Sequence, residues 1–145
     1  MFSDECLIER GKGKQREWVF CTLSQKWDKE IIDAVPKGKQ ILVMIWAGIN
    51  LLYGGIKMVI MERDPHSNHQ GYSAHSYMLA LEEGLLPIYY NGLIFQQDNT
   101  HIHTTLNTLT WFHIVGVIRI IWPSCFLDLN LIKNLWAALK THLYE

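Results

Sequence analysis

Apolar and polar positions in the first half of the chain are arranged in segments that predict β-strands. Residues 16–22 and 40–49 are rich in β-branched and aromatic side chains, and residues 58–61 form a shorter run of the same kind. Polar turn sequences with glycine or proline separate the longer segments. A further strand is expected to end at residues 2–4 with almost no chain before it, so we expect this first strand to be truncated.

The longest apolar run, residues 41–61, is long enough to be mistaken for a membrane span, for which about 20 residues suffice. Asn50, Lys57 and the pair of glycines at 54 and 55 interrupt it, with β-branched or aromatic residues on both sides of this turn. Two buried strands joined by a tight connection explain the pattern better than a membrane helix. We therefore predict a β-hairpin and no membrane contact.

Helical periodicity begins after a polar loop at residues 62–72. Ser73 is a suitable N-cap, and Pro87 would stop the helix that follows, so we predict a helix over residues 74–86. One apolar stripe supports it: Tyr77, Met78, Leu81 and Leu85.

Strands and helices alternate in the rest of the chain. A strand at residues 92–97 leads directly to Asp98, and a strand at residues 117–122 ends at Pro123. Between them a weaker helix is marked by Leu106, Leu109 and His113. A final helix can be capped by Asp128 or Asn130, and its stripe consists of Leu129, Ile132, Leu135, Trp136, Leu139 and Leu143.

This order of elements predicts an α/β fold in which helices cover a mixed β-sheet. With 145 residues, 49% of them hydrophobic, the chain fits a single domain with a real core over residues 1–145. The formal net charge of −1 excludes the overall basic field of a typical DNA-binding module, so any contact with nucleic acid must be local. Three scattered cysteines without a CxxC pair favour reduced thiols, and no secretory signal is visible.

Candidate chemistry centres on two aspartates. Asp4 and Asp98 each follow an apolar strand segment, and in open α/β sheets functional residues gather at the carboxyl ends of strands. If the two strands are neighbours, the carboxylates converge, and a hard cation such as Mg²⁺ or Mn²⁺ would relieve their repulsion. A two-metal site of this kind cleaves phosphodiesters, but it normally needs a third carboxylate.

Lys133 stands where that third carboxylate is expected. Thirty-four residues separate Asp98 from Lys133. At about 100° per residue, Lys133 lies beside Leu129 and Trp136 on the border of the apolar stripe, so its side chain is expected to point toward the sheet edge. An ammonium group cannot bind a metal ion and repels one.

Each aspartate alone also has a simpler explanation. Asp4 can cap or pair at a strand end, and Asp98 can form an Asx turn before Asn99. Several segments together, however, resemble the catalytic domain of the mariner-type transposases of the DDE superfamily of endonucleases. They are FSDE from Phe2, ILVMIWAGI, GLIFQQDN followed by His103, and WPSCFLDLNLIKNLW.

The resemblance implies a ribonuclease-H-like fold, DNA as substrate, two Mg²⁺ or Mn²⁺ ions, and strand cleavage followed by strand transfer during transposition. By position, Asp4 and Asp98 match the first two metal-binding aspartates, and Lys133 occupies the position of the third acid. His103 matches the family histidine, which could orient Asp98 or a substrate phosphate or simply cap the next helix. Asn99 lies in the same motif as a candidate DNA contact.

Departures from the family pattern cluster around Lys133. The family motif WPPYSPDLNPIENLW reads WPSCFLDLNLIKNLW here, and each of the six replacements needs one nucleotide transition. The upstream helix-turn-helix DNA-binding domains of the family are also not found in this sequence. We therefore expect a degenerate transposon copy whose catalysis is impaired, with Glu5 and Asp128 left open as alternate ligands.

A local basic segment is the remaining candidate for DNA contact. Arg10, Lys12, Lys14 and Arg16 alternate, so an extended hairpin could present all four to a phosphate backbone. Solvated hairpin charge is the simpler interpretation. The histidines at 66, 69, 75, 101 and 103 give only a weak indication of zinc, without cysteine partners.

Two classes of function remain. The first is a metal-dependent DNA-cleaving transposase domain, acting in the nucleus with DNA and other transposase subunits as partners and with no small-molecule cofactor. The alternative is a non-catalytic remnant, or a module that binds nucleic acid or transposase subunits. We expect the second class for this chain, because of Lys133, the truncated first strand and the absent recognition domains, although its domain class remains that of the first.

Overall fold

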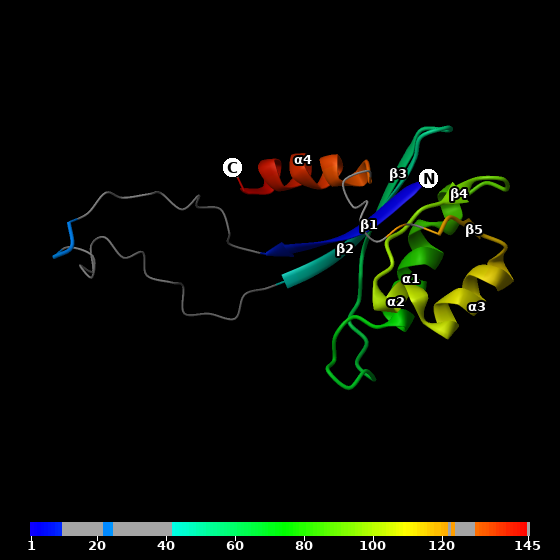
Figure 1. Cartoon of the computed structure of the whole chain (residues 1–145), viewed down its shortest axis with the longest axis horizontal. Coiled ribbons are helices and arrows are strands. Elements are labelled where there is room, and N and C mark those ends of the chain that lie inside the picture. Colours follow the sequence, from blue (N-terminus) through cyan, green and yellow to red (C-terminus); the bar gives the residue numbers. More distant parts are fainter. Residues whose placement is uncertain (10–21, 25–41, 122, 124–129, 145) are drawn as a thin grey trace.

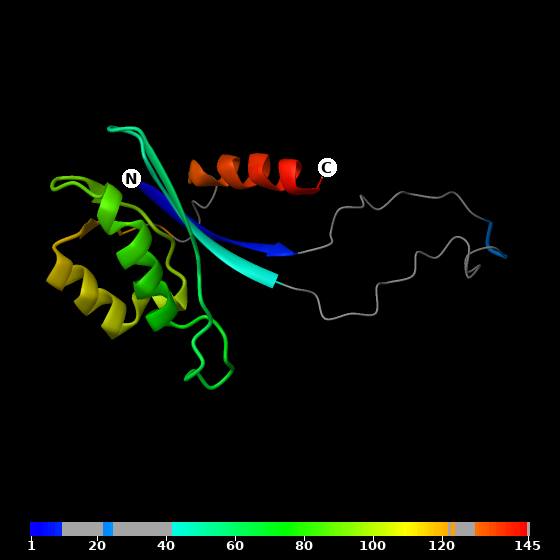
Figure 2. The same ribbon diagram turned by 180° about the vertical axis from the view of Figure 1, so that it is seen from behind.

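The computed structural model describes residues 1–9, 22–24, 42–121, 123 and 130–144. Within them it is a mixed α/β arrangement with helices on two sides of strands (Figures 1 and 2). The predicted strand at residues 16–22 falls almost entirely outside the described residues, as do Trp122 and Asp128.

Three antiparallel strands form the main sheet, in the order β1 (Phe2–Glu9), β2 (Leu42–Asn50) and β3 (Gly55–Ile60). The predicted hairpin of the apolar run is confirmed, because β2 and β3 pair across the turn that follows Asn50. The Asn50 carboxamide stabilises this turn by accepting hydrogen bonds from the backbone N–H groups of Leu52 and Tyr53. None of the described helices has the length and apolar character that crossing a membrane requires.

Two short parallel strands, β4 (Ile94–Phe95) and β5 (Ile118–Arg119), extend this arrangement. Gln96, just after β4, forms a parallel bridge with Phe2 of β1. Its backbone accepts a hydrogen bond of 3.0 Å from Ser3 N–H and donates one of 2.9 Å to Met1. Neighbouring segments therefore run in the order β3, β2, β1, β4, β5. Both parallel strands are shorter than predicted from their apolar runs.

Helix α1 (Ala74–Gly84) covers one face of the sheet. The Ser73 cap is confirmed, since its hydroxyl accepts hydrogen bonds from the first turn in a capping box. Pro87 lies inside a short 3-10 helix, η1 (Leu86–Ile88), which follows α1 directly. At Gly84 the helix approaches the sheet so closely that a Cβ atom would lie 2.4 Å from the Trp46 ring.

Two further helices, α2 (His101–Thr104) and α3 (Leu106–Val115), lie on the same side as α1. The helix at α3 was predicted, but the stripe that marked it was wrong in part, because Leu106 is 78% exposed. Thr108 and Phe112 are buried instead. The reason is that Leu106 is the first residue of the helix, after its Thr105 cap, and points away from the core.

Helix α4 (Ile132–Tyr144) covers the opposite face of β1 and β2. Ile132 and Trp136 of the predicted stripe are buried with Cys6 and Ala47 in a core of their own. Leu143, at the far end of the stripe, is half exposed. The sheet thus has a larger core beneath α1 and α3 and a smaller one beneath α4.

Candidate functional site

The two predicted aspartates lie on neighbouring segments, as the parallel bridge between Phe2 and Gln96 requires. Asp98 follows β4 closely, as predicted. The expectation that Asp4 ends a strand is wrong, because β1 continues to Glu9 and pairs with β2 along its whole length. Residues 5–9 are less uniformly apolar than those of β2, and the partner strand rather than local sequence keeps them extended.

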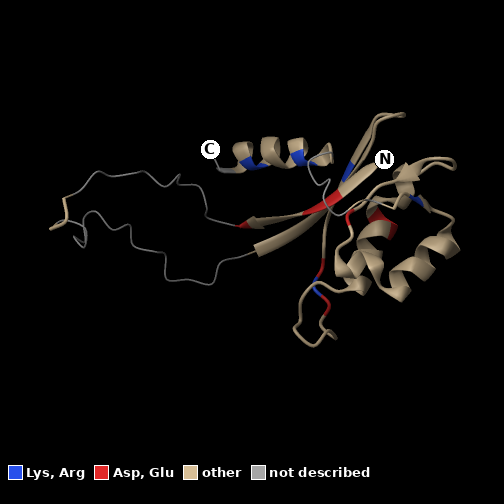
Figure 3. Ribbon diagram, viewed as in Figure 1, with Lys and Arg blue, Asp and Glu red and all other residues tan. Residues whose placement is uncertain are grey.

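Strand alternation sends Asp4 and Glu5 to opposite faces of β1. Asp4 is paired with Ala47 of the core beneath α4, whereas Glu5 is paired with Trp46 of the core beneath α1. Glu5 therefore points away from α4 and toward α2. Figure 3 shows the acidic stretch of β1 and a basic position in the first turn of α4.

The Asp4 carboxyl group lies in an environment that disfavours its charge. Burial, and then the negative charges of Glu5 and Asp98, raise its pKa to about 6. The backbone N–H of Glu5 donates a hydrogen bond of 3.0 Å to Asp4 Oδ1 and opposes this shift. The indole N–H of Trp136 also lowers the pKa, although it makes no well-formed hydrogen bond to a described residue. Asp4 and Asp98 are thus electrostatically coupled.

The Asp98 carboxylate, in contrast, is held by several donors. His103 Nδ1 lies 2.7 Å from Oδ1, and Thr100 donates to the same oxygen from its backbone N–H at 2.9 Å and from its hydroxyl. The contact with His103 is the main cause that holds the pKa of Asp98 well below its usual range, and the Thr100 hydrogen bonds add to it against the effect of burial. The Asx turn and the histidine contact therefore coexist.

His103 is buried between two carboxylates. Its Nε2 atom lies 3.3 Å from Glu5 Oε2, an ion-pair contact without good hydrogen-bond alignment. Burial lowers the pKa of His103, but the contacts with Asp98 and Glu5 outweigh it and raise the pKa to about 10. The imidazole is therefore protonated at neutral pH and can bridge β1 to the segment after β4.

Tyr77 of α1 completes this buried network. Its ring lies 4.2 Å from the His103 ring, and its hydroxyl donates a hydrogen bond to Gln97 Oε1. Gln97 in turn donates from Nε2 to the His103 carbonyl at 3.4 Å. Burial raises the pKa of Tyr77 well above its usual value, so the phenol stays neutral and remains a donor.

Lys133 lies in the first turn of α4 and is partly buried. Asn130 attaches this turn to β1, because its Nδ2 donates a hydrogen bond of 2.9 Å to the Ser3 carbonyl. Asn130 Oδ1 also accepts from the Ile132 backbone N–H at 3.3 Å, which makes Asn130 the cap of α4. Lys133 thus lies three residues before Trp136, on the helix that covers Asp4.

Metal binding by this cluster rests on few ligands. Among the described residues, no three histidine, cysteine, aspartate or glutamate side chains form a group able to hold a metal ion. His66, His69 and His75 are exposed and belong to no such group. The four basic candidates Arg10, Lys12, Lys14 and Arg16 lie outside the described residues.

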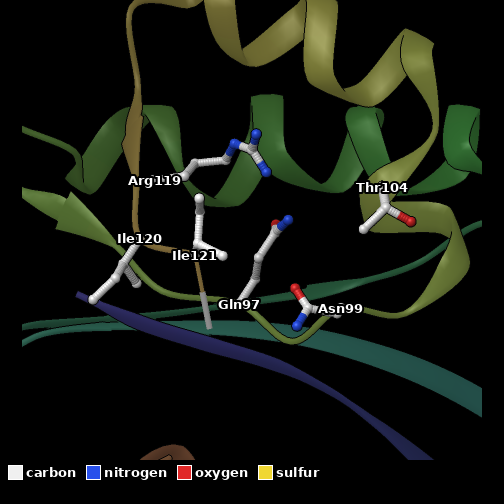
Figure 4. Close-up of a pocket in the computed structure, with 6 residues that line it drawn as sticks. All are labelled: Gln97, Asn99, Thr104, Arg119, Ile120 and Ile121. Atoms are coloured by element: carbon white, nitrogen blue, oxygen red, sulfur yellow. The ribbon is translucent and has the colours of Figure 1, made fainter. Parts of the chain in front are cut away.

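A cavity of about 200 Å³ opens at the residues that flank Asp98 in the chain (Figure 4). The predicted DNA contact Asn99 is exposed and lines it together with Gln97, Thr104 and Arg119, and Ile120 and Ile121 complete it. Sequence reasoning missed Arg119, and it raised Glu5 only as an alternate metal ligand. The adjacent acidic pair Asp4 and Glu5 was visible in the sequence, but the partner of Glu5 lies 98 positions further along the chain.

Comparison with known proteins relates part of the chain to transposases. No family model matches it. Over 52 residues, or 36% of this chain, it is 44% identical to the transposable element Tc1 transposase of Caenorhabditis elegans. It is 40% identical over 51 residues to the Tcb2 transposase of Caenorhabditis briggsae and over 50 residues to the Tc3 transposase of Caenorhabditis elegans, in each case about 35% of this chain.

The similar segment is short relative to these proteins. It spans 19%, 19% and 15% of the Tc1, Tcb2 and Tc3 transposases, respectively. Over about 50 residues, this chain is therefore homologous to the transposases of Tc1-like and Tc3-like transposable elements.

Proposed function

We propose that the chain forms a DNA transposase catalytic domain of the mariner-type DDE class, with a ribonuclease-H-like fold and impaired catalysis. One observation carries the proposal. The parallel bridge between β1 and the segment after β4 brings Asp4 and Asp98 close enough for the charge of one to raise the pKa of the other. The order of neighbouring segments, β3, β2, β1, β4, β5, supports the fold assignment.

The donor set formed by Asp4 and Asp98 suits a divalent ion. Asp4 and Asp98 offer oxygen ligands of the kind that Mg²⁺ and Mn²⁺ prefer, and their mutual repulsion favours a cation between them. Among the described residues, the hydrogen bonds and ion pair at the Asp98 side chain all reach Oδ1, so Oδ2 is the oxygen available to a cation. Two carboxylates are a better ligand set for one divalent ion than for two ions.

When bound, such an ion would activate a water molecule or hydroxyl group for attack on a DNA phosphodiester. The chain itself would fix the Asp98 carboxylate through Thr100 and His103, in an orientation set before substrate arrives. A transposase domain would meet its DNA in the nucleus, together with further transposase subunits.

Lys133 is the reason to propose impairment. Its charge lies in the first turn of the helix that covers Asp4, where the family resemblance places the third acid. An ammonium group at the position of the third acid supplies no ligand, and its positive charge would repel a divalent cation rather than bind it. The same residue favours the second candidate function, a non-catalytic remnant that retains only contacts with DNA or transposase subunits.

A cleavage assay separates these possibilities. The chain and its Lys133→Glu variant are incubated with nicked and branched DNA in Mn²⁺, and Lys140→Glu on the same helix serves as the control for charge reversal. We expect strand cleavage by Lys133→Glu alone. Cleavage by the unaltered chain would refute impairment, and cleavage by none of the three proteins would contradict the catalytic assignment.

A further inference from the structure

The cavity beside Asp98 lies where the carboxyl ends of two parallel strands meet. Gln97 and Asn99 flank Asp98 after β4, whereas Arg119, Ile120 and Ile121 come from the end of β5 and the segment after it. Figure 4 shows these side chains and Thr104 of α2 around a common space. Ligands of open α/β sheets bind at such ends. The cavity therefore lies where a ligand is expected, and the two residues that flank Asp98 in the chain line it.

Two of its walls are fixed by internal hydrogen bonds. The Gln97 carboxamide is held by the Tyr77 hydroxyl and by the His103 carbonyl, and it is 4% exposed. The Thr104 hydroxyl donates to the His101 carbonyl at 3.2 Å. These groups shape the cavity but have little hydrogen-bonding capacity left for a ligand.

Arg119 is the charged group of the cavity. Its guanidinium group lies over the Phe112 ring, 4.7 Å from the ring centre, and the side chain is partly buried. Stacking on a ring fixes the plane of the guanidinium and leaves the N–H donors at its edge for other partners. Among the described residues, the Arg119 guanidinium group makes no hydrogen bond or ion pair, and the cavity lining contains no carboxylate.

This combination favours an anionic ligand. A guanidinium edge binds phosphate oxygens in a bidentate manner, and a partly buried site strengthens that contact. A volume of about 200 Å³ has room for a phosphate group with part of its sugar, and Ile120 and Ile121 provide an apolar surface for the sugar.

We propose that this cavity binds a backbone phosphate of the DNA strand, with Arg119 as the anchoring cation. The inference rests on the proposed function, because a strand held with its scissile phosphodiester at Asp98 would extend past the neighbouring residues Gln97 and Asn99, which line the cavity. Arg119 is then a substrate-positioning residue. Its contact is with phosphate, so it contributes affinity without reading the base sequence.

The test is DNA binding without divalent ions, measured by fluorescence anisotropy of a labelled nicked duplex over a range of salt concentrations. Arg119→Gln is compared with Arg63→Gln. Arg63 lies on the loop after β3, over the Tyr72 ring at 5.6 Å, so its substitution removes a similar contact with an aromatic ring. We expect Arg119→Gln to weaken binding about fivefold to tenfold and to reduce the salt slope by about 0.9, as for one lost phosphate contact. Arg63→Gln should leave both unchanged.

Arg119→Lys guards against a folding artefact. It keeps the charge but not the fork, so the salt slope should stay unchanged while affinity falls partway. Inorganic phosphate, added at constant ionic strength, should weaken DNA binding by the unaltered chain but not DNA binding by the Arg119→Gln variant. If phosphate competes with DNA but Arg119→Gln binds DNA as well as the unaltered chain does, the cavity is a site for free phosphate instead.

Three results would overturn the inference: an unchanged salt slope in Arg119→Gln, equal losses in the two glutamine variants, or no DNA binding by the unaltered chain. The proposed catalytic function is judged separately by cleavage in the Lys133→Glu background. If Lys133→Glu cleaves DNA and Arg119→Gln binds it normally, only the cavity assignment fails. If Arg119→Gln loses affinity and Lys133→Glu is inactive, only the catalytic assignment fails.

Discussion

The acidic cluster has two halves, Asp98 and Asp4, which differ in how the surrounding chain stabilises their carboxylates. Asp98 is held by His103 and Thr100, and its pKa is held below the usual range. Asp4 lies in a partly buried position beside like charges, which raise its pKa to about 6 after the effect of burial, and the helix above it carries Lys133. One half stabilises its carboxylate, and the other does not.

Under the proposed function, this difference separates structural from catalytic requirements. The His103 network joins β1, α1, α2 and the segment after β4, so its loss would affect folding. Lys133 lies at the edge of the smaller core, where a change of charge leaves Ile132 and Trp136 in place. Under the proposed function, a change of charge at the position of the third acid is therefore compatible with the fold.

The largest effect is expected from His103→Ala. It removes the partner of two carboxylates, Asp98 and Glu5, and should lower the free energy of unfolding by about 3–5 kcal/mol, as for other broken buried ion pairs. Urea unfolding measures the loss. The exposed neighbour His101→Ala is the control, with a change expected within about 0.5 kcal/mol. Equal losses in the two variants would show that the network is not a structural support.

The pH dependence of stability gives a second measure of how His103 supports the half of the cluster that contains Asp98. The folded pKa of His103 is raised to about 10 from an ordinary value near 6.5, so its stabilising contribution is complete below about pH 6.5. It is lost as the pH rises from there through about 10. His103→Ala should remove this decline, and an unchanged profile in the variant would contradict the ion-pair assignment.

Lys133→Glu should raise the metal affinity of the half of the acidic cluster that contains Asp4. Under the proposed function, replacing the Lys133 ammonium with a carboxylate on the helix that covers Asp4 is expected to tighten Mn²⁺ binding at least about tenfold, or about 1.4 kcal/mol. The Mn²⁺ dependence of the thermal unfolding midpoint measures this affinity. Lys140→Glu makes the same change of charge further along the same helix. An equal gain in Mn²⁺ affinity in this variant would mean a general electrostatic effect.

Asn130→Ala tests the attachment of α4 to β1. The variant loses the hydrogen bond to the Ser3 carbonyl and the cap on the Ile132 N–H, and a loss of about 1–2 kcal/mol is expected. Urea unfolding against the exposed Asn134→Ala measures it. A change within about 0.5 kcal/mol for Asn130→Ala would mean that apolar contacts alone place this helix.

The smallest effect is expected from Asp4→Asn. Because the folded pKa of Asp4 is about 6 and its ordinary value is 3.8, the folded state binds more protons between these limits and loses stability as pH rises through them. Asp4→Asn should flatten this decline and stabilise the protein at pH 7. Solvent screening at this partly exposed position limits the gain to about 1 kcal/mol. The exposed Glu62→Gln is the control, and a destabilised Asp4→Asn would contradict the assignment.

Local patterns in the sequence predicted much of the fold. The Ser73 cap was recognisable, and so was the hairpin at residues 41–61, because caps and tight turns depend on residues close together in the chain. The stripe of α4 correctly placed Ile132 and Trp136 in a core. Leu106 was misplaced, because hydrophobicity alone does not show which turn of a helix meets the core.

The candidate site was less accessible from sequence. The roles of Asp4 and Asp98 were suggested by a resemblance, and the structure brings these residues together without testing their chemistry. Arg119 lies in a run with isoleucines on both sides, which favours a strand, and only its place over Phe112 marks it as a cavity residue. The interior position of Asp4 depends on β2, which begins 38 positions later in the chain.

The sequence by itself determined the hairpin of β2 and β3, the order of α1, α3 and α4, the apolar faces of α1 and α4, and the position of Asp98 after a strand. Each of these features depends on periodicity or on neighbouring residues. Tertiary structure alone decided that Glu5 faces His103, that Asp4 faces α4, and that Arg119 lines a cavity beside Asp98. The physical reason is that a strand assigns its residues to two alternating faces, whereas the pairing of strands and the seating of helices decide what each face meets.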